Sequence, residues 1–580
     1  MNTERRVRTI GRLRIVLLAL SVALALPAWA QEPILSNRDI VHPVRAAHGM
    51  VASQDAIATG IGVDILRRGG NAVDAAVAVG FALAVTLPRA GNLGGGGFML
   101  LHLAAANRTL AIDYRETAPA AAHRDMYLDA AGDADEHKLR RSHESVGVPG
   151  TVAGLTDALA RYGTMPLATV MAPAIALAED GFSVSEDLAA GLAERRAVFA
   201  RWPESMRVFF KPDGGIYAAG ETLRQPDLAA SLRRIAADGP DAFYRGAIAE
   251  KIAAEMAAHG GVMTAADLAA YRAVEREPVR GHYRGYDVLS MPPPSSGGVH
   301  LIQMLNILEG YDLAALGHNS AASIHLMTEA MRRAYADRAT HLGDPDFHRV
   351  PVKGLIAKRY AEALRQTIDP AHATASDTVR AGNPLPFEGD QTTHFSVIDA
   401  QGNAVANTYT LNHSYGSHIV AGGTGILLNN EMDDFAARPG APNSYGLLGG
   451  EANAIAPGKR PLSSMTPTIL LRDGQPVLAV GSPGGSRIIT IVLQTIVNLV
   501  DHRMNLAAAV YAPRIHHQWQ PDLLSAETGI SPDTIRLLEG MGHKVEASRA
   551  AGSVQAIRRD GAGLTGISDP RTPGGLALGY

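Results

Sequence analysis

Cysteine is absent from this chain of 580 residues. The absence excludes disulfide bonds, thiolate nucleophiles and zinc sites built on cysteine. Two motifs of common hydrolases are also missing, because the sequence holds neither the H-E-x-x-H spacing of zinc proteases nor the G-x-S-x-G turn of serine hydrolases. The histidines that invite a metal or triad interpretation, His394 and His516-His517, are therefore interpreted as structural, and we expect no metal and no cofactor.

A strong charge of either sign is lacking as well. The chain carries 53 Lys and Arg against 57 Asp and Glu, a net charge of −4 with a pI near 6.6. It therefore has no overall basic field for nucleic acid or anionic membranes, and neither is expected as a partner. With 46% hydrophobic residues the chain can bury a large core. Length alone suggests several domains of roughly 150 residues, although a chain of this length can also form one large domain.

No apolar run near the N-terminus is long enough to span a membrane. The run from Ile15 to Leu26 falls short of the roughly 20 residues that a spanning helix needs. Five arginines precede it and Ala28-Trp29-Ala30 follows, which is the pattern of a cleavable signal peptide. We predict that residues 1–30 are removed and that the protein is periplasmic or secreted. An uncleaved anchor is the alternative, and Arg5-Arg6 does not identify the export route.

Two helices are predicted early in the mature chain, over 54–68 and 72–86. Gly69-Gly70 ends the first and Asn71 caps the second, which is rich in Ala and Val on every side and so is expected to be buried. A glycine run, Gly91 to Gly97, follows. It lacks the Lys-Ser/Thr of a phosphate loop and follows a helix rather than a strand, so we interpret it as a place of close backbone packing.

A β-hairpin is predicted after the hydrophilic, loop-like segment 371–390. The strands cover 393–398 and 404–411, and Gly402 supplies the positive φ of the turn. If the loop is 400–402, Asp399 faces Asn403, and counting outward places Thr392 opposite Thr410. Directly opposed residues have Cβ atoms roughly 4.5–5.5 Å apart, within reach of a hydroxyl–hydroxyl hydrogen bond. A slip of one residue would break this prediction.

A second hairpin, with strands over 468–471 and 476–480, leads into Gly481-Ser482-Pro483-Gly484-Gly485 and a helix over 487–500. Glycines at a helix N-terminus leave backbone N–H groups free to hold an anion. The pattern predicts an oxyanion hole at this point of the chain.

The sequence from Pro43 to Tyr580 resembles the γ-glutamyltranspeptidase family, with motifs in matching order. The quoted segments are Asp113-Tyr114-Arg115-Glu116, Gln391-Thr392-Thr393-His394-Phe395-Ser396-Val397, Gly402-Asn403-Ala404-Val405, Asn429-Asn430-Glu431-Met432-Asp433-Asp434-Phe435, Pro461-Leu462-Ser463-Ser464-Met465 and Gly481-Ser482-Pro483-Gly484-Gly485-Ser486-Arg487. The resemblance implies an α+β fold, the four-layer αββα sandwich of N-terminal-nucleophile hydrolases. It also implies a precursor that cuts itself between Gln391 and Thr392, giving a large subunit, 31–391, and a small catalytic subunit, 392–580, in one heterodimer.

The resemblance also assigns roles to site residues. Thr392 is the nucleophile, Thr410 lies beside it, and the amides of Gly484 and Gly485 form the oxyanion hole. The remaining assignments concern the γ-glutamyl head group, with Arg115, Ser463 and Ser464 on its α-carboxylate and Asn412, Glu431 and Asp434 on its α-amino group. The residue types suit these tasks, because a guanidinium and hydroxyls bind an anion and carboxylates bind a cation.

The chemistry explains why a threonine can act as the nucleophile without a second catalytic side chain as base. As the first residue of a new chain, Thr392 has its own α-amine as general base. The family reaction takes the γ-glutamyl group from glutathione and related compounds as an ester on this threonine, expels an amine such as cysteinylglycine, and passes the group to water or to an amino-acid or dipeptide acceptor.

Alternative functions remain open at this point. An acylase on the same scaffold, acting on cephalosporin or glutaryl side chains, would use Thr392 in the same way. The segment 439–450 with Tyr445 resembles the family's active-site lid, which such acylases often lack, and so favours γ-glutamyl donors. Glu431 stands where some relatives carry glutamine. A periplasmic binding protein that only captures its ligand would need no cut, and a metal- or serine-dependent hydrolase lacks a supporting motif.

Overall fold

The computed structural model describes residues 39–384 and 395–580. Residues Pro43–Tyr580 form one compact unit, preceded by the separate segment Met1–His42. The predicted signal peptide and the predicted cut between Gln391 and Thr392 lie outside the described residues, as does His394. Among the helices of the described ranges, none is long and apolar enough to cross a bilayer.

Two antiparallel sheets of seven strands form the centre of the unit. The first has the order β21 (Leu576–Gly579), β2 (Met50–Ser53), β10 (Phe395–Ile398), β11 (Ala404–Thr410), β3 (Gly96–Leu103), β4 (Arg108–Tyr114), β7 (Val274–Arg276). The second has the order β1 (Val44–Ala46), β20 (Gly563–Ser568), β19 (Gln555–Asp560), β15 (Gln475–Gly481), β14 (Thr468–Arg472), β9 (Tyr286–Ser290), β8 (Val279–Tyr283). Each sheet thus contains strands from both the first and the last third of the chain.

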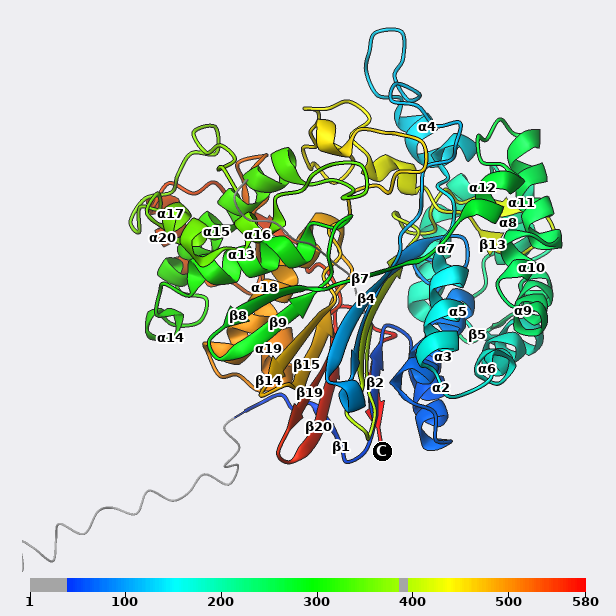
Figure 1. Cartoon of the computed structure of the whole chain (residues 1–580), viewed down its shortest axis with the longest axis horizontal. Helices are drawn as coiled ribbons and strands as arrows, with labels where there is room; N and C mark the ends of the chain where they lie inside the picture. Colours follow the sequence, from blue (N-terminus) through cyan, green and yellow to red (C-terminus); the bar gives the residue numbers. More distant parts are fainter. Residues whose placement is uncertain (1–38, 385–394) are drawn as a thin grey trace, which may run out of the picture. The chain divides into compact units, whose positions relative to one another are not determined.

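The two sheets pack face to face, because β10 and β11 contact β15 and β19 contacts β2. Helices cover both outer faces (Figure 1). Those beside the first sheet are α2 (Ala56–Arg67), α3 (Ala72–Thr86), α5 (Thr151–Tyr162), α6 (Leu167–Asp180), α7 (Glu186–Phe199), α8 (Pro203–Phe209), α9 (Pro226–Asp238), α10 (Asp241–Tyr244), α11 (Ala247–Ala258) and α12 (Ala265–Ala270). Those beside the second are α13 (Gly297–Leu308), α14 (Leu313–Leu316), α15 (Ala321–His341), α16 (Val352–Leu355), α17 (Lys358–Arg365), α18 (Ile488–Val500), α19 (Leu506–Tyr511) and α20 (Pro532–Gly540). The predicted αββα sandwich is confirmed.

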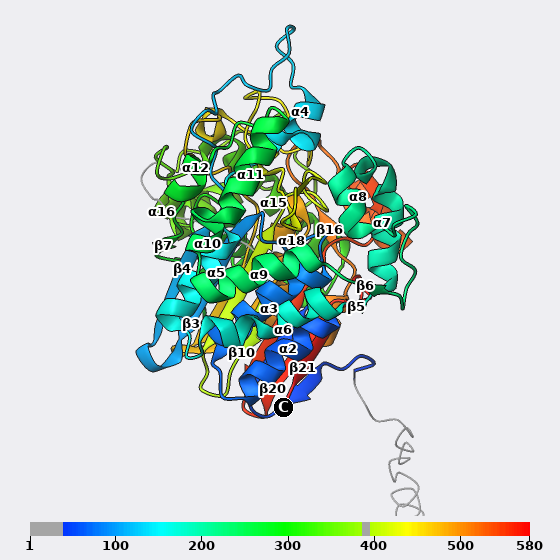
Figure 2. The same cartoon turned by 90° about the vertical axis from the view of Figure 1, so that its right-hand side faces the viewer.

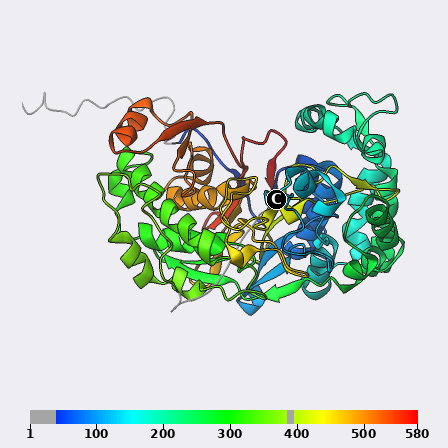
Figure 3. The same cartoon turned by 90° about the horizontal axis from the view of Figure 1, so that it is seen from above.

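The helix layers are held by buried apolar faces. Helix α3 contacts β10, β11, α2, α5 and α6, and every one of its residues is buried, as predicted. Figure 2 shows α3, α6 and α9 lying in front of the first sheet, and Figure 3 shows the two helical layers on opposite sides of the strands. The remaining elements are short: α4 (Glu136–Arg141), β5 (Phe182–Ser183), β6 (Thr222–Leu223), β12 (Val420–Ala421), β13 (Ile426–Leu427), β16 (Ile515–His516), β17 (Leu524–Glu527) and β18 (Val545–Ser548).

Local chemistry sets the ends of the first two helices. Asp55 caps α2 by accepting from the Ala58 N–H, so this helix begins two residues later than the sequence predicted. Asn71 caps α3 in a capping box with Asp74, at the predicted position. The Asp399 carboxylate also accepts from the Ala72 N–H at 2.9 Å, which fixes the first hairpin to the start of α3.

The predicted register of the first hairpin holds for the described pairs. Phe395 pairs with Asn407 and Ile398 with Ala404, the Asp399 N–H donates to the Asn403 carbonyl at 3.1 Å, and Gly402 has φ 89°. The second hairpin forms between β14 and β15 with a bulge after Leu470. The register therefore places Thr410 at the end of β11.

The glycine run packs backbone against backbone, as predicted. A Cβ on Gly94 would lie 2.0 Å from the Leu427 carbonyl oxygen, and one on Gly95 would lie 2.0 Å from that of Thr410. Only hydrogen fits there. This close approach fixes the start of β3 against the end of β11, where Thr410 lies.

Candidate active site

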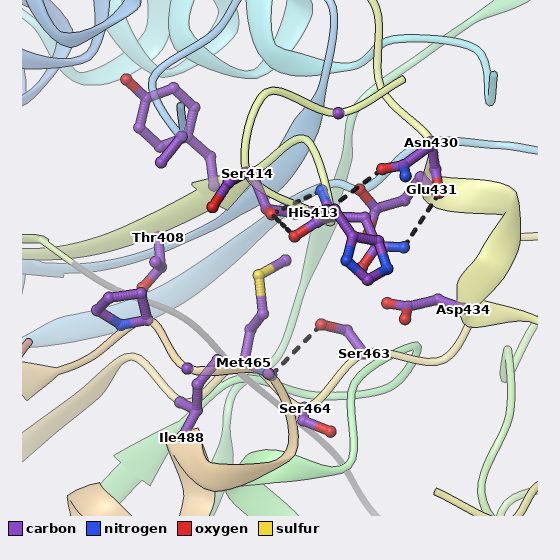
Figure 4. A pocket seen from close by; sticks show the side chains of 18 of the residues that line it. Thr408, His413, Ser414, Asn430, Glu431, Asp434, Ser463, Ser464, Met465 and Ile488 are labelled. Atoms are coloured by element: carbon purple, nitrogen blue, oxygen red, sulfur yellow. Dashed lines mark hydrogen bonds between the residues drawn. The ribbon is translucent and has the colours of Figure 1, made fainter. Parts of the chain in front are cut away.

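A cavity of about 480 Å³ lies beside the ends of β4 and β11 and the start of η5 (Gly485–Arg487). It contains every predicted site residue that the structure describes: Arg115, Thr410, Asn412, Glu431, Asp434, Ser463, Ser464, Gly484 and Gly485. In Figure 4, Glu431 and Asp434 lie on one side of the view and Thr408 on the other, with Ser464 at the lower edge. Thr392 lies outside the described residues.

Arg115 is the buried cation of this cavity. It follows β4, its side chain is 1% exposed, and its guanidinium forms ion pairs with Glu431 and, at 2.5 Å, with Asp434. Its Nε donates to the Pro461 carbonyl at 3.2 Å. Burial opposes the charge, but Glu431, Asp434 and Glu116 outweigh it and raise the pKa of Arg115. Arg115 is therefore permanently charged.

Three carboxylates surround this one guanidinium. Glu116 lies 4.0 Å from Arg115. Both Glu116 carboxylate oxygens and Glu431 Oε2 are buried, and none of the three has a hydrogen bond to a described residue. Burial raises the pKa of Glu431 and Asp434, and it raises that of Glu116 to about 7. The cluster has more negative than positive charge when ionised, so it is suited to an added ammonium group. The sequence assigned Arg115 and the acids to opposite groups of the ligand, whereas the structure shows them in direct contact.

A second arginine, Arg338 of α15, was missed by the sequence analysis. It is 5% exposed and lines the cavity, and it donates to the Ser464 and Ser296 hydroxyls at 3.1 and 2.8 Å. No carboxylate of the described residues forms an ion pair with it. Burial lowers its pKa to about 10, so it stays charged at neutral pH. The Ser463-Ser464 pair thus lies beside an unneutralised guanidinium, which is suited to a carboxylate.

The loop after β11 has an uncommon backbone. Asn412, Tyr415 and His418 have φ of 73°, 64° and 65°, the left-handed region that non-glycine residues rarely occupy. Such conformations cluster at binding sites, where surrounding contacts enforce them. Here the Asn412 side chain donates to the Asn430 carbonyl at 3.0 Å and accepts from the Tyr445 hydroxyl at 3.0 Å.

The predicted lid segment covers part of the cavity. The Tyr445 ring stacks on His413 with centroids 5.1 Å apart, and its edge lies against Gly485. Gln518 donates to the Tyr445 carbonyl at 3.0 Å. Tyr445 therefore connects the loop after β11 to the predicted oxyanion hole.

The glycines of the predicted oxyanion hole adopt conformations that favour glycine, φ 142° for Gly484 and 56° for Gly485. Within the described part of the chain, neither N–H donates a hydrogen bond. They precede α18, whose N-terminus adds a favourable field for an anion. Two backbone donors are thus available at the cavity wall.

Thr410 Oγ1 accepts from the Asn412 N–H at 2.8 Å. Two further cavity groups, Thr408 Oγ1 and Gln555 Oε1, are buried and have no hydrogen-bond partner among the described residues. Strand alternation could have indicated Thr408, since residues two apart share a face with Thr410. Nothing in the sequence around Gln555 indicated its position.

Of the histidines interpreted as structural, His516 and His517 do not line the cavity, and His394 lies outside the described residues. His516 bonds to Thr490 and Gln518, and His517 contacts Asp522 at 3.2 Å. Burial lowers the pKa of His516 to about 3, so it is neutral. Among the described residues, two groups have the spacing of metal ligands, His143-Glu255-His259 and His325-Glu329-His543, and neither lines the cavity.

Comparisons with known proteins agree with this geometry. The family model described as Gamma-glutamyltranspeptidase matches residues 58–579. The Glutathione hydrolase proenzyme of Escherichia coli (strain K12) is 56% identical over 94% of both chains, and that of Pseudomonas sp. (strain A14) is 48% identical over 93% of this chain and 95% of its own. The crystal structure of cephalosporin acylase from Bacillus halodurans superposes with a TM-score of 0.83 at 29% identity, covering 96% of this chain and 99% of that one. This chain belongs to the γ-glutamyltranspeptidase family.

Proposed function

We propose that the chain is an exported, self-processing γ-glutamyltransferase and glutathione hydrolase. The observation that carries the proposal is the convergence of a buried acid–arginine cluster, two seryl hydroxyls and two backbone N–H groups on one cavity. These N–H groups make no hydrogen bond to a described residue. That cavity also contains Thr410, the residue that the hairpin register predicts opposite Thr392. The basic and apolar pattern of residues 1–30 supports export to the periplasm or the medium.

Maturation is proposed to begin with Thr392. Its hydroxyl attacks the Gln391 carbonyl carbon, the peptide C–N bond breaks, and the acyl group moves from nitrogen to oxygen. Water then hydrolyses the ester, which leaves the Gln391 carboxylate on the large subunit, 31–391, and a free α-amine on the small subunit, 392–580. That amine becomes the general base for the next reaction.

Donor binding follows from the charges of the cavity. The α-ammonium is proposed to bind the carboxylates of Glu431 and Asp434, with Asn412 beside them. The α-carboxylate is proposed to bind Arg115, Ser463 and Ser464. Because both groups are attached to one carbon, the contact between Arg115 and the acids suits a single α-amino-acid head group.

The acyl transfer then proceeds through one ester intermediate on Thr392. Thr392 Oγ attacks the γ-carbonyl carbon while its amine takes the hydroxyl proton, and the oxyanion is held by the N–H groups of Gly484 and Gly485. The amide C–N bond breaks and the proton passes to the leaving amine, which for glutathione is cysteinylglycine. Water releases glutamate, and an amino-acid or dipeptide acceptor takes the γ-glutamyl group instead.

The acylase alternative is disfavoured by the acid cluster. A glutaryl side chain has no ammonium group, so the buried carboxylates of Glu116, Glu431 and Asp434 would have no cation beyond Arg115. The test compares glutathione with glutaryl-cysteinylglycine, which lacks only the α-amine, and measures release of cysteinylglycine from each. We expect turnover of glutathione alone, and equal rates would indicate an acylase.

A further inference from the structure

One part of the cavity wall carries positive charge that the proposed glutamyl head group does not use. Arg89 follows α3, Arg141 ends α4, and Arg195 lies on α7, and all three line the cavity. Together with His418, which also lines the cavity, they are called the arginine arm. None of the three arginines forms an ion pair with Glu431 or Asp434 among the described residues.

The arginine arm is only partly neutralised. Arg89 Nη2 lies 3.1 Å from Asp187, yet Arg89 Nε and Nη2 are both buried and make no hydrogen bond with any described residue. Arg195 lies 3.3 Å from its neighbour Glu194, which is 71% exposed, so this contact is weak. For Arg141 the described residues offer no carboxylate within ion-pair distance. The buried Nε of Arg89, which has no acceptor among the described residues, indicates a place for an anion.

His418 adds an uncharged donor to the same wall. His418 is 5% exposed, and within the part of the chain that the structure describes neither ring nitrogen has a hydrogen bond. Burial, together with Arg195 and Arg141, lowers its pKa to about 4, so the ring is neutral and retains one N–H. Its ring packs edge-on against Phe199 of α7 at 5.0 Å, which fixes its orientation. A neutral N–H near the guanidinium groups of Arg195 and Arg141 favours a carboxylate over a cation.

We propose that the arginine arm binds the C-terminal carboxylate of the peptide that leaves the donor and, in transfer, that of a dipeptide acceptor. The inference rests on the proposed function. A γ-glutamyl peptide has one ammonium and two carboxylates, and the cavity has one acid cluster and two cationic regions, at Arg115 with Arg338 and at the arginine arm. Matching charge in this way orients a substrate and speeds its capture.

The test compares three γ-glutamyl donors that share the glutamyl head group. Glutathione keeps the C-terminal carboxylate, glutathione C-terminal amide replaces it with an uncharged group, and γ-glutamyl-p-nitroanilide has no peptide at all. Release of glutamate without acceptor gives kcat/KM for each donor. In Arg89→Met and Arg195→Met we expect kcat/KM for glutathione to fall about 3–10-fold, because both side chains are partly exposed and solvent weakens their charges. The rates with the amide and the anilide should be unchanged.

The neighbouring residue provides a matched control. Arg196 lies next to Arg195 on α7 but donates to the Gly214 carbonyl and does not line the cavity, so Arg196→Met should behave as wild type with all three donors. Unchanged anilide turnover also shows that each variant is folded. Equal losses on all three donors, or a glutathione rate like that of Arg196→Met, would overturn the inference. A wild-type enzyme that released glutamate from no donor would instead contradict the proposed function, and the inference with it.

Discussion

At the scale of single residues, the acid cluster around Arg115 combines two opposing demands. Three buried carboxylates repel one another and lose hydration, while one guanidinium offsets part of both costs. Removing Arg115 would leave those charges unpaired, which typically costs about 3–5 kcal/mol, so its substitution would test folding as much as binding. Asp434, which is 14% exposed, allows a cleaner test.

The first prediction concerns Asp434→Asn. The change keeps the shape and removes one charge from the ammonium site, so donor binding should weaken by about 1.5–3 kcal/mol, or roughly 10–100-fold in kcat/KM. Self-cleavage should proceed, because Asp434 is assigned to the substrate. Denaturing gels and steady-state rates with glutathione check both parts. If the variant stayed uncut, Asp434 would have a structural role instead of a role in substrate binding.

The second prediction concerns Arg338→Met. Because Arg338 has no carboxylate partner among the described residues, its loss leaves no buried anion unpaired, and Tm should change little. The donor α-carboxylate should lose a nearby cation, so KM for glutathione should rise about tenfold with kcat less affected. Steady-state rates measure the change in KM, and a thermal melt measures the change in Tm. A large drop in Tm with KM unchanged would assign Arg338 to folding alone.

The third prediction follows from Glu116, whose pKa burial raises from 4.5 to about 7. A carboxyl group with a raised folded-state pKa stabilises the fold below its unfolded pKa, and this contribution is lost as pH rises towards the folded value. The Tm of the empty enzyme, measured relative to Glu116→Gln, should therefore fall between pH 4.5 and 7. Melting curves across this range test the sign, and a difference in Tm that stayed constant would mean that Glu116 is ionised throughout.

At the scale of elements, the sequence predicted best those features that depend on residues close together in the chain. Gly402 and the strand alternation were enough for the register of the first hairpin, and Asn71 marked the start of α3. Long-range contacts were not predictable from the residues themselves. Arg115 and Glu431 lie 316 positions apart, and only the family resemblance placed both in one site.

The roles of arginines on charged helices were equally hard to predict from sequence. Helix α15 carries Arg332, Arg333 and Arg338, and the first two pair with Glu329 while the third faces the cavity. All three arginines lie in one helical segment, and the sequence does not show which of them pairs with Glu329 and which lines the cavity. Only the packing of the helix in the fold shows this. Arg195 and Arg196 on α7 differ in the same way.

The fourth prediction concerns the lid segment. Tyr445 connects Asn412 to Gly485, so Tyr445→Ala should open the cavity to water. We expect a severalfold lower kcat/KM for the donor and a larger share of hydrolysis at a fixed concentration of dipeptide acceptor. Tyr445→Phe keeps the ring and should retain most of the wild-type partition. If the alanine variant partitioned like wild type, the lid would not control access of water.

At the scale of the whole molecule, the proposed cut separates two pieces that share both sheets. In the first sheet β21, β10 and β11 come from the small piece and β2, β3, β4 and β7 from the large one. In the second, β20, β19, β15 and β14 from the small piece lie between β1 and β9 of the large one. Hydrogen-bonded strand neighbours therefore cross between the pieces at five places: β21–β2, β2–β10, β11–β3, β1–β20 and β14–β9.

The fifth prediction follows from this interleaving. Each piece alone would expose unpaired strand edges and the apolar face between the sheets, so the two should stay together after cleavage and unfold in one cooperative transition. Native mass spectrometry should give one heterodimer, denaturing spectra two chains, and N-terminal sequencing a small chain that begins at Thr392. Thr392→Ala should remain one inactive chain with a similar Tm, because the strand pairing is the same before and after the cut. Pieces that separated on dilution, or a small chain that began elsewhere, would contradict the proposed maturation.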